Sequence, residues 1–161
     1  MKNLLIASLL LLTFIQPSFS AGSSSDSSTS KTDYEKAIKY VKQAKKYEEK
    51  GKTDKAQKRY QKAQKLLIAS NAEIPNKADT LNYLGFTTRK LGDFETGEKY
   101  YLEGLAIEPN HIGINEYLGE LYVATGRMEQ AKKRLNILKN CNCKEFEALK
   151  EIIEGKKKSK Y

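Results

Sequence analysis

The chain has 161 residues, a length typical of a single domain, with 39% hydrophobic and 30% charged residues. Two cysteines exclude a small scaffold held by several disulfides, and one histidine without a Cys–His cluster excludes the usual structural zinc site. The formal net charge is +9, and residues 31–65 concentrate it with 13 basic and 5 acidic side chains. This basic segment favours encounters with anionic surfaces.

The first residues have the pattern of a secretory signal peptide. Lys2 gives a positive start, an apolar run spans residues 4–15, and Pro17 ends it. Small residues stand three and one positions before Ala21, the spacing that signal peptidase recognises. We therefore expect a signal peptide over residues 1–20, cleavage after Ser20, and a periplasmic or secreted protein. An uncleaved anchor is the alternative, although the run is shorter than the roughly 20 residues of a membrane span.

A serine-rich linker follows the signal pattern. Residues 21–31 carry small polar side chains with nothing to pack against, which predicts a flexible connection. Beyond it, apolar residues recur every three or four positions, which predicts helices and no β-strand. Thr32 and Glu35 have capping-box spacing at the start of the first helix. Gly51 ends that helix, and Thr53 is placed to cap the second.

Five further helices are expected after the second. The third covers about residues 77–90, and Asp93 is placed to cap the fourth. Asn110 is placed to cap the fifth, and the sixth reaches about residue 140. The loops between the helices are short, which predicts antiparallel neighbours. The seventh helix carries four apolar residues on one face, namely Phe146, Leu149, Ile152 and Ile153.

A 34-residue repeat runs through these helices. Gly85 of a Leu-Gly pair recurs as Gly119, and Gly92 recurs as Gly126. The repeat resembles the tetratricopeptide-repeat family, whose other positions are met by Tyr101, Pro109, Tyr122, Ala131 and Leu135. The chain departs from the family pattern at Thr88, Gly97, Gly104 and Asn115. We expect Gly85 and Gly119 to let the two helices of their hairpins approach closely.

A looser copy of the repeat precedes these two. Gly51 and Gly92 are 41 residues apart, seven more than the period. Seven residues are about two helical turns, so the second helix is expected to be longer and to reach about Asn71. The residues of this copy that match positions of the repeat are Tyr40, Ala44, Tyr47, Gly51, Ala56, Tyr60 and Ala63.

The resemblance implies an all-α right-handed superhelix of three helical hairpins with a C-terminal capping helix. Residues 76–90 are also similar to one branch of the family, the small exported proteins of Gram-negative bacteria. The implied domain spans residues 32–155, and a basic tail follows at 156–161. Its parts are repeats at about 34–74, 77–110 and 111–143 and a capping helix at 144–154.

Few residues offer catalytic chemistry. His111 is the only histidine that could act as a base for a nucleophile, and its place at a helix start needs no such role. Glu116 and Glu120 stand one helical turn apart, whereas the paired carboxylates of glycosidases flank a substrate. The glycines match no phosphate-binding loop. We expect a protein that is not an enzyme and that uses no cofactor and no metal.

Cys141 and Cys143 allow three interpretations. In an oxidising compartment they form a small disulfide that locks a turn. They are otherwise two ordinary small residues beneath the last helix, or two sulfur ligands of an incomplete redox or metal site. The sequence leaves their oxidation state open.

The basic segment is a candidate binding surface on the first hairpin. A solvated end of the stack explains its lysines without a ligand. Anionic envelope polymers and lipid head groups are the candidate ligands, whereas the export signal argues against nucleic acid. The residues of this basic patch are Lys42, Lys45, Lys46, Lys55, Lys58, Arg59 and Lys62.

The resemblance also implies a concave groove, lined by the first helix of each hairpin, that holds a peptide or a partner helix. Asn82 and Arg89 can grip a backbone or a carboxylate, and Phe86 is an apolar anchor. Glu116 and Glu120 attract a basic or amide-rich segment, although each of these groove residues is also consistent with an ordinary exposed polar side chain. The expected groove residues are Asn82, Phe86, Arg89, Glu116, Glu120 and Val123, together with Val41, Lys45 and Glu48 from the first copy.

Together these patterns predict a non-enzymatic module of the periplasm that binds a protein or peptide, as an assembly or scaffolding factor for an envelope complex. The alternative is a surface-associated structural protein that holds anionic envelope polymers or lipid head groups through the first hairpin and the lysine-rich tail. The identity of the partner and the oligomeric state do not follow from the sequence.

Overall fold

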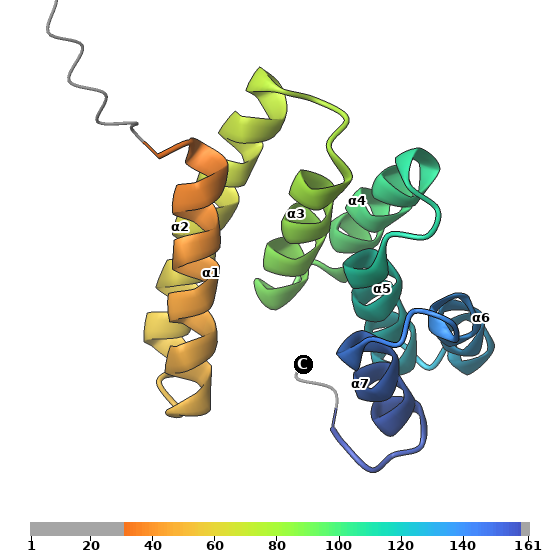
Figure 1. Cartoon of the computed structure of the whole chain (residues 1–161). Helices are drawn as coiled ribbons and strands as arrows, with labels where there is room; N and C mark the ends of the chain where they lie inside the picture. The colour runs from red at the N-terminus through yellow and green to blue at the C-terminus, as the bar shows by residue number, and fades with distance from the viewer. Residues whose placement is uncertain (1–30, 159–161) are drawn as a thin grey trace, which may run out of the picture.

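The structure is a computed structural model that describes residues 31–158, so the predicted signal peptide and most of the linker lie outside it. Within these residues the chain forms seven α-helices and no strand (Figure 1). No helix of the described chain has the length and apolar character that crossing a membrane requires. The helices are α1 (Asp33–Glu49), α2 (Thr53–Glu73), α3 (Ala78–Lys90), α4 (Phe94–Ile107), α5 (Ile112–Ala124), α6 (Met128–Leu138) and α7 (Lys144–Ile153).

The helices pair as antiparallel hairpins that stack along the chain. α1 packs on α2, α3 on α4 and α5 on α6, while α2 contacts α3 and α4 contacts α5 (Figure 1). α7 covers the last hairpin by packing on α5 and α6. The predicted fold class, an all-α stack of three hairpins with a capping helix, is confirmed. α2 is the longest helix and ends at Glu73, two residues beyond the predicted Asn71.

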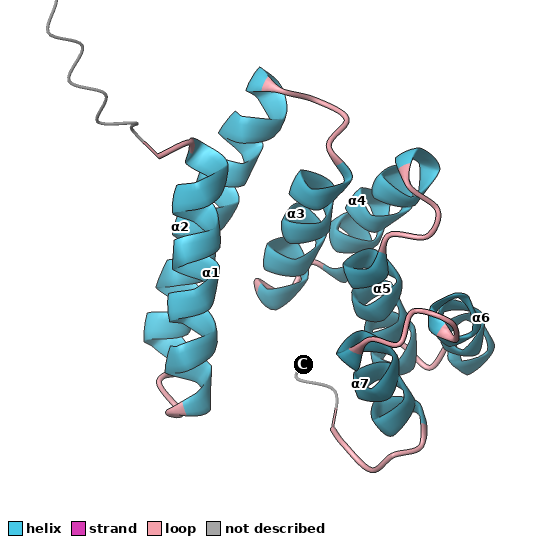
Figure 2. Ribbon diagram, viewed as in Figure 1, coloured by secondary structure: helices cyan, strands magenta, loops and turns pink. Residues whose placement is uncertain are grey.

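Tight turns within the hairpins depend on glycine. A short loop joins the two helices of each hairpin (Figure 2). Gly51, Gly92 and Gly126 lie in these loops and have φ values of 65°, 97° and 75°. Only glycine adopts this left-handed conformation without a Cβ penalty. The 34-residue spacing between Gly92 and Gly126 is therefore a spacing between equivalent turns.

Two of the predicted helix caps are confirmed. The Thr32 hydroxyl accepts from the Glu35 N–H, and the Glu35 carboxylate accepts from the Thr32 N–H, which completes the capping box of α1. The Asp93 carboxylate accepts from the Thr96 N–H at the start of α4. The prediction for α2 is wrong, because Thr53 is already helical and Lys52 is the cap residue, without a side-chain hydrogen bond.

His111, and not Asn110, caps α5. The His111 backbone N–H donates to Glu108 O, which closes a turn and moves the start of the helix by one residue. His111 Nδ1 then accepts from the Ile114 N–H at 3.1 Å, and Nε2 lies 3.1 Å from Asp79 Oδ1. One imidazole ring thus caps α5 and connects it to the first turn of α3.

The hydrophobic core has two parts. The first part lies between α1, α2 and α3, where alanines such as Ala37, Ala44 and Ala63 are fully buried and let the long helices approach. The second part lies between α4, α5 and α6 around Tyr101 and Leu118, both fully buried. Stacking each hairpin on the next therefore buries a face that a single hairpin would expose.

Gly85 permits the close approach of α3 and α4, as predicted. A Cβ atom at Gly85 would lie 2.5 Å from the aromatic ring of Tyr101 in α4. Gly119 serves a different contact, because a Cβ there would lie 2.5 Å from Leu149 in α7. The expectation that Gly119 faces the other helix of its own hairpin is thus wrong, and Gly119 instead seats the capping helix.

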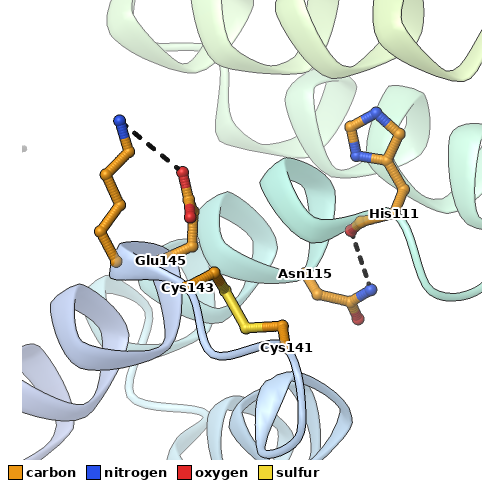
Figure 3. Close-up of a disulfide and its surroundings, with 6 residues drawn as sticks. His111, Asn115, Cys141, Cys143 and Glu145 are labelled. Carbon is orange, nitrogen blue, oxygen red and sulfur yellow. Dashed lines mark hydrogen bonds and ion pairs between the residues drawn. A yellow bond between two sulfur atoms is a disulfide. The ribbon is translucent and has the colours of Figure 1, made fainter.

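The loop between α6 and α7 contains a disulfide. Cys141 and Cys143 are bonded, with Cα atoms 5.2 Å apart, and Cys143 is the cap residue of α7 (Figure 3). Asn142 between them has a positive φ of 47°. The bond therefore fixes the turn from which the capping helix starts. No group of three or more metal-ligating side chains occurs among the described residues.

The Gly85 contact predicts a specific stability loss. Gly85→Ala should lower the free energy of unfolding by about 2–3 kcal/mol, because the added methyl overlaps a rigid, buried ring. Urea denaturation followed by circular dichroism measures this loss. In a Tyr101→Leu background the same change should cost much less, because the ring is gone. An equal cost in both backgrounds would contradict the close approach.

Candidate functional site

A groove lies on the concave side of the stack, between α1 and α7, with α3 and α5 between them. Its volume is about 510 Å³. Each of these four helices contributes to its lining, so the groove exists only when the hairpins are stacked. The lining residues are Lys45, Glu48, Glu49, Thr53, Phe86, Arg89, Lys90, Glu116, Tyr117, Glu120, Ala148, Ile152 and Lys157.

The floor of the groove is an aromatic pair covered by a lysine. The rings of Phe86 and Tyr117 have centroids 4.9 Å apart, and the ring of Tyr60 makes an edge-type contact with Phe86 at a centroid distance of 5.8 Å. Lys45 Nζ lies 4.5 Å from the centroid of Phe86 and donates to Tyr117 Oη at 3.1 Å. Phe86 lines the groove but is only 5% exposed, so this predicted apolar anchor lies in the floor of the groove.

Arg89 is a structural cation. Its side chain is 2% exposed, and Nη1 donates to Tyr117 O at 2.6 Å while Nη2 donates to Glu120 Oε2 at 3.3 Å. A buried charge is tolerated only when it is paired and hydrogen-bonded, and both conditions are met here. Arg89 therefore fastens α3 to α5, in place of the predicted role of gripping a ligand.

A second ion pair fixes the wall formed by α1. Lys90 Nζ lies 2.6 Å from Glu48 Oε1, and Tyr60 Oη donates to Glu48 Oε2 at 2.8 Å. Burial, together with this hydrogen bond to Glu48, raises the pKa of Tyr60 above its usual value. The Glu48 carboxylate thus joins α1 to α2 and α3.

Glu116 differs from the other acidic groups of the groove. Its side chain is half-buried and forms no hydrogen bond or ion pair with any residue between 31 and 158. Burial is the main reason that the pKa of Glu116 rises to about 7, and Glu120 and Glu145 raise it further. Lys45 and Arg89 act in the opposite direction. Near neutral pH this carboxylate is therefore poised between its charged and neutral forms.

The remaining predicted groove residues lie elsewhere. Asn82 is 5% exposed and packs beside Gly113 at the start of α5. A Cβ atom on Gly113 would lie 2.9 Å from the amide nitrogen of Asn82. Val41 is buried in the first part of the core. Val123 packs on the second part of the core and does not line the groove.

Several lining residues were not anticipated. Tyr117 follows Glu116 directly and shares a helix face with Glu120, so its place was foreseeable from the helical period. Ala148, Ile152 and Lys157 come from α7 and the segment after it. The repeat pattern ends before α7, so no signal in the sequence placed these residues on the concave side.

The basic patch is centred on α2 rather than spread over both helices. Arg59 and Lys62 lie 5.6 Å and 5.9 Å from the ring of Tyr40. Lys45 does not belong to the patch, because its side chain lies in the groove, whereas Lys42 and Lys46 are exposed on α1. The residues around a shallow hollow of about 620 Å³ on this face are Tyr47, Lys55, Lys58, Arg59, Gln61, Lys62 and Lys65.

The unpaired state of Glu116 predicts a pH-dependent effect on stability. Ionisation of Glu116 is costly in the folded chain, because its pKa is about 7 there against 4.5 in the unfolded chain. The carboxylate therefore lowers stability progressively as the pH rises from about 4.5 to about 7. Glu116→Gln should stabilise the protein by about 2 kcal/mol at pH 8, since glutamine never ionises, and should have little effect at pH 4.

Urea denaturation at the two pH values measures this difference. Glu103→Gln is the matched control, because Glu103 is exposed on α4. It should change stability equally little at both values. A Glu116→Gln effect that is the same at low and high pH would show that the carboxylate is not held in a costly environment.

Comparison with known proteins supports the fold. No family model and no curated protein matches the sequence. The Yersinia enterocolitica type III secretion translocator chaperone SycD is similar in structure, with a TM-score of 0.55 and 14% identity over 75% of this chain and 83% of that chain. SycD in complex with a peptide of the translocator YopD gives a TM-score of 0.53 and 16% identity over 80% and 92%.

A tetratricopeptide-repeat domain is also similar. The first such domain of Spaghetti (RPAP3), bound to an HSP90 peptide, has 21% identity over 77% of this chain and 95% of that chain, with a TM-score of 0.49. Three stacked hairpins, glycine turns 34 residues apart and a capping helix are the features of this architecture. The chain therefore shares its fold with SycD, and its Gly92 and Gly126 turns, 34 residues apart, match the tetratricopeptide-repeat pattern of the sequence.

Proposed function

We propose that this protein is a non-enzymatic module that holds a short segment of a partner protein in the groove between α1, α3, α5 and α7. The observation that carries the proposal is the groove itself, about 510 Å³ in volume and lined by all four helices. A volume of this size accommodates a few side chains of a bound segment. SycD, which shares the fold, has been determined with a peptide of its translocator bound.

The walls of the groove are fixed before any partner arrives. The Lys90–Glu48 pair holds α1 against α3, and Arg89 holds α3 against α5. A preorganised site loses little conformational entropy on binding, which favours affinity. The surface is nevertheless small, so we expect affinities for isolated peptides in the micromolar range.

The place of action that we propose is the periplasm. The signal-peptide pattern of the first 20 residues supports export. An exported module without catalytic chemistry fits a role in assembling or scaffolding an envelope complex. In this role the groove recruits a segment of one component while the convex side stays available to others.

A blocked groove tests the proposal. Ala148 is half-buried on α7 and lines the groove, so Ala148→Arg should fill it. Ala106→Arg on the exposed side of α4 is the matched control. Peptides selected from a random display library on the parent protein should bind Ala148→Arg at least tenfold more weakly by fluorescence anisotropy. They should bind Ala106→Arg with an affinity close to that of the parent.

Two results would argue against groove binding. Peptides that bind both arginine variants as well as the parent would place the binding surface elsewhere. A library that yields no binder above background would indicate that the groove does not hold peptides.

The basic patch supports a second candidate function, binding to anionic envelope polymers or lipid head groups. Lys55, Lys58, Arg59, Lys62 and Lys65 form no ion pair with any residue that the structure describes. The lysines at 156–158 add to the positive charge of the chain. Cations without an ion-pair partner remain available to an anionic surface.

Vesicle binding tests this second function. The parent protein should sediment with vesicles of phosphatidylcholine and phosphatidylglycerol at low salt and dissociate as the ionic strength rises to about 0.3 M. Lys58→Glu combined with Lys62→Glu should abolish sedimentation. Lys132→Glu combined with Lys133→Glu on α6 changes the charge equally and should leave most of it. If both double variants lose sedimentation equally, binding depends on the net charge of the protein and not on the basic patch.

A further inference from the structure

The cations of the groove are already engaged by the protein itself. Lys45 covers Phe86 and donates to Tyr117, and Arg89 is held by Tyr117 O and Glu120. Lys90 pairs with Glu48 at 2.6 Å, and Lys157 lies 3.7 Å from Glu151. A partner carboxylate would therefore have to displace an existing contact to obtain a cation here.

The carboxylates are in a different situation. Glu48 and Glu120 have partners in Lys90 and Arg89, and Glu49 is exposed to water at the rim. Glu116 is the half-buried carboxylate of the groove that has no hydrogen bond or ion pair within the described chain. A charged oxygen in this setting has lost part of its hydration without gaining a protein donor, which is unfavourable.

The surroundings of Glu116 suit a long cationic side chain. Glu116 lines the groove and also a second hollow of about 510 Å³ that continues toward α7. Ala148 lines both hollows, and Ile152 lies in the wall of the first. Lysine and arginine pack an aliphatic stem on apolar surface while the charged end reaches a carboxylate. The charge-assisted hydrogen bond that results is stronger than a neutral one.

Resting on the proposed peptide-binding function, we infer that the bound segment presents a lysine or arginine side chain to Glu116. Glu116 is then the residue that determines specificity: it selects a basic segment and disfavours an acidic one. The other groove residues set the position of the segment, because Arg89 and Lys90 already pair with carboxylates and Lys45 already contacts Phe86 and Tyr117.

The charged groups that face Glu116 give this recognition a pH dependence. Glu120 on the same helix and Glu145 on α7 raise its pKa, while Lys45 on α1 and Arg89 on α3 lower it. A bound cation must displace the proton of Glu116 wherever that proton is present. Since the pKa in the free protein is about 7, affinity for a basic segment should fall as the pH is lowered from 8 to 5.

A double-mutant cycle between protein and peptide tests the inference. Peptides selected from a random library are first checked for at least tenfold weaker binding to Ala148→Arg, which identifies those held in the groove. Each lysine or arginine of such a peptide is then replaced by norleucine or citrulline. One replacement should weaken binding to the parent protein at least tenfold at pH 8. It should weaken binding to Glu116→Gln less than threefold.

Glu116→Gln retains the size of the side chain, so we expect this variant to fold. Glu103→Gln is the control and should bind the peptides like the parent protein. Groove-bound peptides without any basic residue would overturn this inference and leave the proposed function intact. The inference would also be overturned if replacing each basic residue of the peptide weakened binding to the parent protein and to Glu116→Gln by the same factor. The absence of groove-bound peptides would instead contradict the proposed function itself.

Discussion

The buried guanidinium of Arg89 determines how α3 and α5 sit against each other, and the groove depends on that arrangement. It donates to Tyr117 O and Glu120 of α5, and its Cζ lies 5.6 Å from the ring centroid of Phe86 and 5.9 Å from that of Tyr101. Gly97 on α4 leaves the necessary space, because a Cβ there would be 3.2 Å from Arg89 Cβ. Close packing against the backbone and Cβ of Arg89 thus explains Gly97, one of the two glycines that depart from the family pattern.

In this arrangement three cations of the groove already contact other groups of the protein. Lys45, Arg89 and Lys90 hold the inner helices together, so the shape of the groove and the balance of its charges have a common origin. Glu116, on the same surface, has no hydrogen bond or ion pair within residues 31–158. Such a site favours ligands that bring positive charge, and its rigidity allows that preference to act without a large rearrangement.

Much of the fold was predictable from the sequence. The 34-residue glycine spacing and the apolar periodicity specify hairpins, and local rules identified the caps at Thr32 and Asp93. The resemblance to the tetratricopeptide-repeat family also placed Phe86, Arg89, Glu116 and Glu120 around one groove, which they line. The ion pairs and hydrogen bonds inside the groove were not predictable. Helical periodicity indicates which face of a helix a side chain occupies, but it does not identify the group that the side chain contacts. The contribution of α7 was missed because it lies beyond the repeat, and His111 was missed as a cap because histidine rarely has that role.

The protonation of Glu116 tests the central claim, which is that the carboxylate of Glu116 binds a cationic side chain of the partner segment. The ¹³C chemical shift of its carboxyl carbon can be followed by NMR against pH, in the free protein and with a saturating groove-bound peptide. The account predicts a midpoint at about pH 7 in the free protein and a clearly lower one in the complex. A midpoint near 4.5 in the free protein, or no change on binding, would contradict it.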